Sequence, residues 1–239
     1  MSELLVEADG PAWIFTLNRP DKRNALSASL VEALLDGVAR ADAAGAALLV
    51  FRGAGSNFSA GFDFTGFDAQ SEGDLLLRFV RIELLLNAIE ASPALTLALA
   101  HGRNFGAGVD LIGACRKRIA SADASFRMPG LKFGLVLGTR RFGAIVGVAQ
   151  ARSILQEART FNAAGALTIG FVEELRELHE WDQAVAVAGG VASSIDNASR
   201  ASLFERLSHN DADADLAALV RSAARPGLRE RIATYLGRA

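Results

Sequence analysis

The stretch His101-Gly102-Arg103-Asn104-Phe105-Gly106-Ala107-Gly108-Val109-Asp110-Leu111 follows the apolar run 95–100 and continues into a short apolar segment. Its small residues permit a tight turn and let a ligand approach the backbone, and a turn that enters a helix exposes N–H groups without intrahelical partners. A second such turn, Phe58-Ser59-Ala60-Gly61-Phe62-Asp63-Phe64, follows the apolar run 46–51. Either turn alone is explained by chain reversal, but two side by side would form a binding site for a developing oxyanion.

Predicted strands and helices alternate around these two turns. The predicted strands cover residues 4–8, 13–17, 46–51, 95–100 and 118–120, the first two being joined by a turn at 9–11. The predicted helices cover 29–41, 74–90 and 109–115, and Ser29 with Glu32 fits a capping box for the first of them. Strands that alternate with helices predict an α/β domain.

Strand signals fade beyond about residue 182. The remaining apolar patterns have helical spacing and predict four helices, over 184–195, 198–207, 213–224 and 228–236. We therefore expect a core over residues 1–185 and an all-helical C-terminal region over residues 186–239.

Composition narrows the class of protein. The chain has 239 residues, is 51% hydrophobic and carries 25 basic against 27 acidic residues, so a nucleic acid is not its expected partner. Cys115 is the only cysteine, which excludes an intrachain disulfide and favours a reducing compartment. No secretory signal is visible, and Arg78, Arg81 and Glu83 interrupt the leucine-rich run 75–86, which excludes a membrane span there. A cytoplasmic location is expected.

Two other kinds of site are absent from the sequence. Glycine pairs at 53–55 and 106–108 lack the third glycine of a dinucleotide-binding fingerprint, and no phosphate-binding Gly-Lys-Ser/Thr loop occurs. His101, His179 and His209 are scattered, and with a single cysteine they offer no metal-ligand spacing. We expect no metal site.

Six segments, in order, resemble the crotonase (enoyl-CoA hydratase/isomerase) family. They are NRPDKRNAL (18–26), FSAGFDF (58–64), GAGVDL (106–111), SFRMPG (125–130), TRRF (139–142) and FNAAGALTIGFV (161–172). The resemblance spans most of the chain. It implies a spiral of ββα units followed by a helical region that packs subunits together, commonly as a homotrimer or a dimer of trimers.

The resemblance also implies a chemistry and a set of site residues. An acyl-CoA thioester would bind with its carbonyl between the backbone amides of Phe62 and Ala107, which stabilise an enolate or a tetrahedral anion. Lys22 and Arg23 match positions beside the phosphates of coenzyme A, although Arg23 is equally well read as an ordinary solvated cation. The other positions assigned to acyl-CoA binding are Ala25, Ala60, Gly61, Asp63, Phe64, Gly106 and Gly130; Asp63 is alternatively a local cap. No cofactor is implied beyond the coenzyme A of the substrate.

The sequence departs from the family pattern at the carboxylates. Hydratases of the family use two, and the matching positions here hold Asp110, a shorter acid than the usual Glu, and Gly130, which has no side chain. Asp110 is the expected acid/base, with a buried structural partner as its alternative role. Arg127 and Arg140 are alternative ligands for a substrate carboxylate. Glu83 is expected to face solvent.

Three functions therefore stay open. The first is an enzyme of enoyl-CoA hydratase or isomerase type that acts through an enolate, with Asp110 as its lone acid/base. The second is a non-catalytic acyl-CoA-binding or assembly subunit, suggested by Gly130. The third is another reaction of the family, such as decarboxylation or thioester hydrolysis, which needs only the oxyanion site and one further group.

Overall fold

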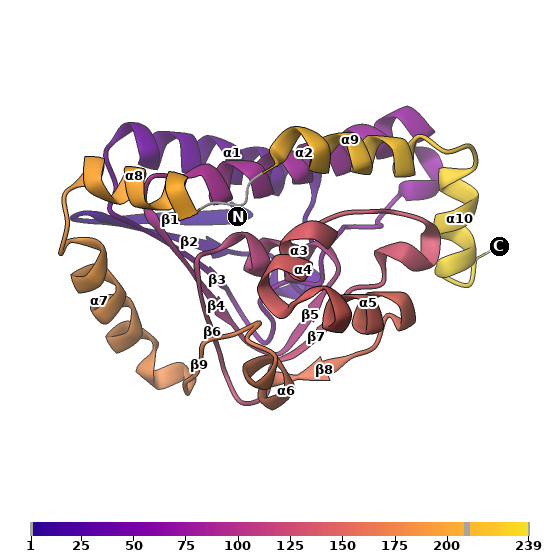
Figure 1. Ribbon diagram of the computed structural model, residues 1–239. Coiled ribbons are helices and arrows are strands. Elements are labelled where there is room, and N and C mark those ends of the chain that lie inside the picture. Colours follow the sequence, from indigo (N-terminus) through magenta and orange to yellow (C-terminus); the bar gives the residue numbers. More distant parts are fainter. Residues whose placement is uncertain (1, 208–210, 239) are drawn as a thin grey trace.

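The computed structural model describes residues 2–207 and 211–238 and is built on a six-stranded sheet (Figure 1). The sheet has the order β1-β2-β3-β4-β6-β9. Its strands are β1 (Leu4–Asp9), β2 (Ala12–Leu17), β3 (Leu48–Gly53), β4 (Leu95–Ala100), β6 (Lys117–Ala120) and β9 (Glu174–Leu175). β1 runs antiparallel to β2, and every other neighbouring pair is parallel.

A smaller sheet completes a spiral of ββα units. It consists of β5 (Arg103–Phe105), β7 (Ser125–Arg127) and β8 (Phe161–Asn162). One turn of the spiral is formed by β4, β5 and α3 (Ala107–Ala114), and the next by β6, β7 and α4 (Thr139–Val146). Because β4 pairs with β6 and β5 with β7, successive turns stack on one another. The expected α/β spiral is confirmed.

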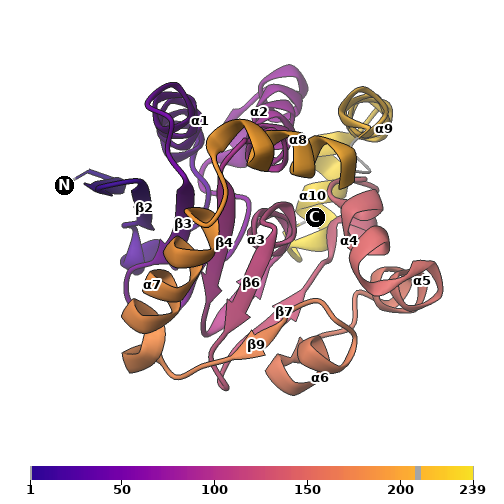
Figure 2. The ribbon, with the colours of Figure 1, turned by 60° about the vertical axis from the view of Figure 1, so that its left-hand side comes forward.

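Alternation along the central strands divides the interior into two cores. Leu49 and Phe51 of β3 belong to the larger one, under α1 (Ala28–Ala43) and α2 (Glu72–Ala91). Leu48 and Val50 point the other way and pack with Trp181 and Ala188 of α7 (Trp181–Ala192). Side chains alternate across a strand, so one sheet serves both cores. Figure 2 shows α1 and α2 over one face of the sheet and α7 across the other.

The last part of the chain is helical, as predicted. It comprises α7, α8 (Asn197–Leu207), α9 (Ala212–Ala223) and α10 (Leu228–Tyr235), while α5 (Val148–Glu157) and α6 (Ala163–Thr168) precede it. α9 packs on α2, and α10 packs on the 3-10 helix η3 (Gly130–Phe133). The expected boundary at 185/186 falls inside α7, and the division into two regions stays a prediction.

Two local predictions were wrong. The first helix begins at Ala28 with Ser27 as its N-cap, whose hydroxyl accepts a hydrogen bond from the Leu30 amide, so Ser29 does not cap it. Glu83 does not face solvent: its side chain is 1% exposed and lies 2.8 Å from Arg141. The charge of a buried partner from another helix, not visible in the local pattern, keeps Glu83 inside. His209 lies outside the described residues.

None of the described helices combines the length and the apolar character that crossing a membrane requires.

Candidate active site

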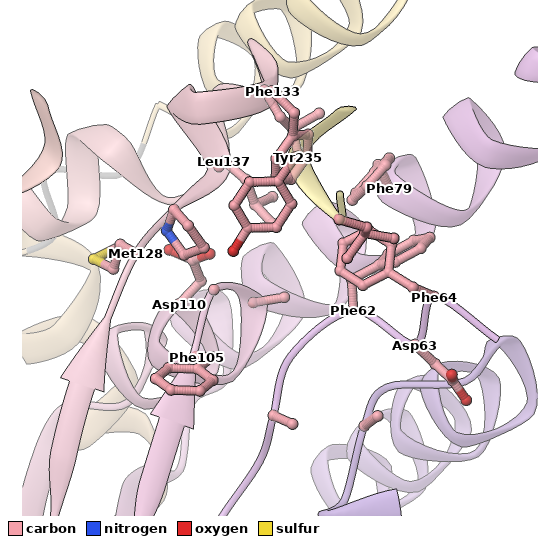
Figure 3. Close-up of a pocket in the computed structure, with 18 of the residues that line it drawn as sticks. Phe62, Asp63, Phe64, Phe79, Phe105, Asp110, Met128, Phe133, Leu137 and Tyr235 are labelled. Carbon is pink, nitrogen blue, oxygen red and sulfur yellow. The ribbon is translucent and has the colours of Figure 1, made fainter. Parts of the chain in front are cut away.

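A cavity of about 700 Å³ lies where the two glycine-bearing turns meet η3 and α10. Eleven of the residues singled out from the sequence line it; these are Lys22, Arg23, Ala25, Ala60, Phe62, Asp63, Phe64, Gly106, Ala107, Asp110 and Gly130. Gly61, the twelfth, is not among the lining residues and lies in the first turn against the backbone of the second. Figure 3 shows Phe62, Phe64 and Asp110 around this space.

Gly61 is the point of closest approach between the turns. Its φ is +78°, and a Cβ there would collide with the Phe105 carbonyl oxygen and stand 3.0 Å from the Ala107 nitrogen. The Phe105 amide donates to the Ser59 carbonyl at 3.1 Å, and a Cβ on Gly108 would stand 2.5 Å from that same oxygen. Only glycine permits this packing, which holds the amides that follow Gly61 and Gly106 close together.

The amides of Phe62 and Ala107 are both available to a ligand. Leu26 pairs with Phe62 in a parallel bridge, in which the Leu26 amide donates to the Gly61 carbonyl and the Asp63 amide donates to the Leu26 carbonyl. This pattern directs the Phe62 amide away from the bridge. Ala107 begins α3, where amides have no intrahelical partner. Within the described chain neither amide donates a hydrogen bond, which is the arrangement that an oxyanion site requires.

Ala107 stands where the family usually has glycine. Among the described non-glycine residues, only Arg23, Asn24 and Ala158 have positive φ. Ala107 therefore keeps an ordinary backbone conformation, and its methyl group imposes no strain on the amide.

Asp110 lies on the first turn of α3, close to the Ala107 amide. The residue is 5% exposed, and its Oδ1 has no hydrogen-bond partner among the described residues. Burial raises the pKa of Asp110 well above its ordinary value; Glu83 raises it further, and Arg141 lowers it. A Cβ on Gly138, whose φ is +61°, would collide with this carboxyl. The site thus holds a desolvated carboxyl that favours its protonated form.

A buried cluster of charges lies behind Asp110. Arg141 of α4 is 2.8 Å from Glu83 and 2.5 Å from Glu90, both on α2, and 3.4 Å from Asp215 on α9. Its guanidinium also donates to the Asn87 side chain. Burial raises the pKa of Glu83, although Arg141 opposes this. The cluster fixes α2, α4 and α9 around the wall that carries Asp110.

No carboxylate faces Asp110 from the position that the family uses. Gly130 begins η3, and its carbonyl accepts a hydrogen bond from the Leu135 amide at 2.9 Å. A Cβ there would stand 3.1 Å from the Leu135 carbonyl oxygen, so the backbone leaves little room for a side chain. The cavity wall here consists of main chain and apolar groups.

Exposed cations lie at the mouth of the cavity. Lys22 and Arg23 sit in a turn whose residues Arg23 and Asn24 have φ of 50° and 52°. The buried Asn24 holds this turn: its side chain accepts from the Arg19 amide at 2.8 Å and donates to two carbonyls of the loop 54–57, each at 2.8 Å. In the part of the chain that the structure describes, neither Lys22 nor Arg23 forms an ion pair.

Asp63 acts as a local cap and as an ion-pair partner. Its carboxylate accepts from the Thr65 amide at 2.9 Å and from Arg19 at 2.8 Å. Burial alone would raise the pKa of Asp63, but the hydrogen bonds from Thr65 and the charge of Arg19 outweigh it and lower the pKa. Asp63 therefore stays ionised and neutralises Arg19 beside the cavity.

An aromatic wall, formed by Phe62, Phe64, Phe79, Phe133 and Tyr235, closes one side of the cavity. Phe62 stacks on Phe79 with ring centres 4.2 Å apart, and Phe133 lies 5.1 Å from Tyr235. Of these residues, Phe62 and Phe64 are site candidates from the sequence, whereas Tyr235 is not. The sequence offers little to indicate a role for Tyr235 beyond its being the single tyrosine of the chain, on the last predicted helix.

The alternative ligands for a substrate carboxylate are engaged elsewhere. The Arg127 guanidinium donates to the Ala158 carbonyl at 3.0 Å, and Arg140 pairs with Asp215 at 2.7 Å. Neither lines the cavity. Cys115 is buried, and burial raises its pKa to about 12, so its thiol is not a nucleophile at neutral pH. Among residues 2–207 and 211–238, no group of three or more His, Cys, Asp or Glu side chains is placed to hold a metal ion.

Comparison with known proteins agrees with this geometry. The family model for enoyl-CoA hydratase/isomerase matches residues 11–222. The protein named probable enoyl-CoA hydratase echA6 of Mycobacterium bovis is 34% identical over 165 residues, which cover 68% of this chain and 66% of that protein. The chain thus aligns with slightly less than two thirds of the length of that relative.

Solved structures extend the match over the whole chain. A Bordetella parapertussis protein described as an enoyl-CoA hydratase/isomerase is 59% identical, with a TM-score of 0.98 and 99% of each chain covered. A Thermobifida fusca protein of this class, in complex with acetoacetyl-CoA, is 26% identical, with a TM-score of 0.76 and 92% of each chain covered. The chain belongs to the enoyl-CoA hydratase/isomerase family.

Proposed function

We propose that this protein binds an acyl-CoA thioester and catalyses a reaction of its family through an enolate, with Asp110 as the single catalytic carboxyl. The observation that carries the proposal is the pair of unpartnered amides, Phe62 and Ala107, held together by Gly61 beside the buried Asp110. Donors fixed in advance at the position of a developing oxyanion contribute about 3–4 kcal/mol each to transition-state stabilisation.

Hydration of a 2-enoyl-CoA is the reaction that we propose first. The oxygen of water bonds to Cβ, the π electrons of the double bond shift toward the carbonyl, and the resulting oxyanion rests on the two amides. A protonated Asp110 gives its proton to Cα, and the proton released by the added water restores the carboxyl. Because burial favours the protonated form of Asp110, a single group can serve as acid and then as base.

The first test follows loss of the conjugated thioester absorbance of a short 2-enoyl-CoA. Asp110→Asn keeps the size of the side chain but carries no acidic proton, and we expect turnover to fall by about two to four orders of magnitude. Unchanged turnover in this variant would remove Asp110 from the mechanism.

The pH dependence of the wild type gives an independent check. If the protonated carboxyl reacts, kcat is highest at low pH and declines as pH rises through the raised pKa of Asp110. If the carboxylate were the reactive form, the same titration would make kcat increase with pH.

A second candidate is a non-catalytic acyl-CoA-binding subunit, which the missing side chain at Gly130 favours. In that case a bound thioester would persist unchanged for hours beside the wild-type protein. Identification of the products by mass spectrometry also separates hydration from decarboxylation and from thioester hydrolysis, since these change the mass of the acyl-CoA differently.

We also propose how coenzyme A is bound, how subunits associate and where the protein is located. Lys22 and Arg23 would bind the phosphates of coenzyme A at the mouth of the cavity, while the acyl group extends toward the aromatic wall. α7 and α8 expose Val187, Val191, Leu203 and Leu207, and we propose that this apolar surface packs between subunits of a homotrimer or a dimer of trimers. We propose a cytoplasmic location.

A further inference from the structure

Hydration requires a group that holds the attacking water, and Gly130, which lines the same cavity as Asp110, has no side chain to supply one. Among the described residues, the polar side chains that line the cavity are those of Asp21, Lys22, Arg23, Asp63, Thr65, Asp110, Thr139, Tyr235 and Arg238. Figure 3 shows Tyr235 beside Asp110, whereas Asp63 lies apart from both. The Thr139 hydroxyl donates to the Leu137 carbonyl at 3.5 Å. The Tyr235 hydroxyl makes no hydrogen bond to the rest of the described chain and is available to a bound molecule.

Tyr235 is oriented toward the reactive end of the cavity. Figure 3 shows its ring reaching into the space from α10, with the hydroxyl on the side where the Asp110 carboxyl lies. The ring centre is 5.1 Å from that of Phe133, a contact that fixes the plane of the phenol. The hydroxyl is therefore the polar end of an otherwise apolar wall.

The helix that carries Tyr235 is firmly attached to the site. Leu228 and Ile232 of α10 are buried. Arg231 donates to the Phe133 carbonyl at 2.8 Å and to the Gly134 carbonyl at 3.3 Å, in the loop that follows Gly130. These hydrogen bonds tie α10 to η3, so the position of Tyr235 is set by the same loop that carries Gly130.

We infer that Tyr235 is a catalytic residue, whose hydroxyl binds the attacking water and passes its proton to Asp110, in place of the carboxylate that Gly130 lacks. This inference rests on the proposed hydration. Asp110 protonates Cα; the water that bonds to Cβ gives a proton to the phenol oxygen, and the phenol gives its own proton to the Asp110 carboxylate. Tyrosine ends unchanged, and the substrate has gained one H at Cα and one OH at Cβ.

Two assays on Tyr235→Phe test this role. The first measures hydration of a short 2-enoyl-CoA; the second measures exchange of the Cα hydrogens of butyryl-CoA with deuterium oxide, which needs Asp110 and the oxyanion site but no added water. We expect kcat for hydration to fall by about 100-fold, within the range for loss of one proton-transfer group. KM and the exchange rate should stay within about twofold, because only the hydroxyl is removed and the ring packing remains.

The matched control is Thr234→Val, which removes an exposed hydroxyl from the adjacent position of α10 outside the cavity lining. It should leave both assays unchanged. Hydration by Tyr235→Phe within twofold of the wild type overturns the inference, and so does a parallel loss of hydration and exchange, which would place Tyr235 in enolate formation or in folding. A wild type inactive in both assays overturns the proposed function itself, and the inference with it.

Discussion

At the scale of a single residue, the burial of Asp110 has opposite effects on folding and on the proposed chemistry. Its carboxyl is buried, one oxygen lacks a partner, and Gly138 packs directly against it. Burial of an ionisable group without full hydrogen bonding is unfavourable for folding, yet the same desolvation raises the pKa and supplies a proton donor. The protonated state that the proposed mechanism needs is thus maintained at the expense of stability.

Asp110→Asn should therefore stabilise the protein while inactivating it. A carboxyl with a raised pKa binds more protons in the folded than in the unfolded state, so its contribution to stability declines as pH rises from the unfolded pKa toward the folded one. We expect the stability of the variant relative to the wild type to increase between pH 4.5 and pH 8, by about 1.4 kcal/mol for each pH unit that lies between the unfolded and the folded pKa of Asp110. Thermal unfolding at both pH values measures the difference; a gain that does not grow with pH would contradict it.

Gly61 should be essential for activity because a side chain at this position has no room, and not only because its φ is positive. Gly61→Ala must push the two turns apart, since the new Cβ collides with the Phe105 carbonyl. We expect kcat to fall by about 100- to 1,000-fold, as for loss of one oxyanion donor. Gly170→Ala is the matched control, since its φ of +73° is similar and nothing lies within 4 Å of its Cβ. Equal loss in both variants would assign the effect to backbone strain.

At the scale of elements, the buried charges of α2, α4 and α9 join the core to the C-terminal helices. Arg141 is 4% exposed and meets Glu83, Glu90 and Asp215. Two of its partners come from one helix and the third from a helix more than 100 residues further along the chain. The cluster orients α4 behind Asp110, so its integrity affects both the stability of the fold and the position of this carboxyl.

Arg141→Met should be strongly destabilising. It leaves buried carboxylates without their cation, and removing one partner of a buried pair costs about 3–5 kcal/mol. Arg40→Met is the control, because Arg40 pairs with Asp36 on the exposed face of α1, with side chains 58% and 68% exposed. Urea unfolding of the two variants should separate them clearly; a loss under about 1 kcal/mol in Arg141→Met would mean that the acids neutralise themselves by binding protons.

Some of these elements and site residues could be predicted from the sequence, and others could not. Short apolar runs bounded by turn residues located β3 and β4, because burial on both faces leaves a continuous apolar run. Small residues after two apolar runs located the two turns, and the resemblance assigned a role to Asp110. Glu83 and Tyr235 could not be placed, because their roles depend on partners from helices distant in sequence. The choice between Ser27 and Ser29 as N-cap depends on backbone geometry, which two nearby serines leave open.

At the scale of the whole molecule, charge is distributed unevenly although the net charge is only −2. Lys22 and Arg23 stand exposed at the mouth of the cavity without ion-pair partners in the described chain. By contrast, Asp63 and Glu83 are paired with arginines, and burial raises the pKa of Asp110. A mouth of this kind attracts a phosphate-bearing ligand from solution.

Lys22→Ala should raise KM for an acyl-CoA by about 5- to 10-fold, as expected for one exposed charge-assisted contact. KM for the corresponding N-acetylcysteamine thioester, which lacks the nucleotide, should not change. Arg159→Ala, an exposed cation outside the cavity lining, is the control. A rise in KM for both thioesters would show that Lys22 acts on the acyl end or on the fold.

The single tyrosine has a practical consequence for spectroscopy. Since Tyr235 is the one tyrosine of the chain and lies in the cavity wall, uniform incorporation of 3-fluorotyrosine would place one fluorine nucleus in that wall and nowhere else. Its ¹⁹F resonance would need no assignment. In a titration with a thioester, the shift and width of that one signal would report how much of the cavity is occupied and how fast the thioester binds and dissociates.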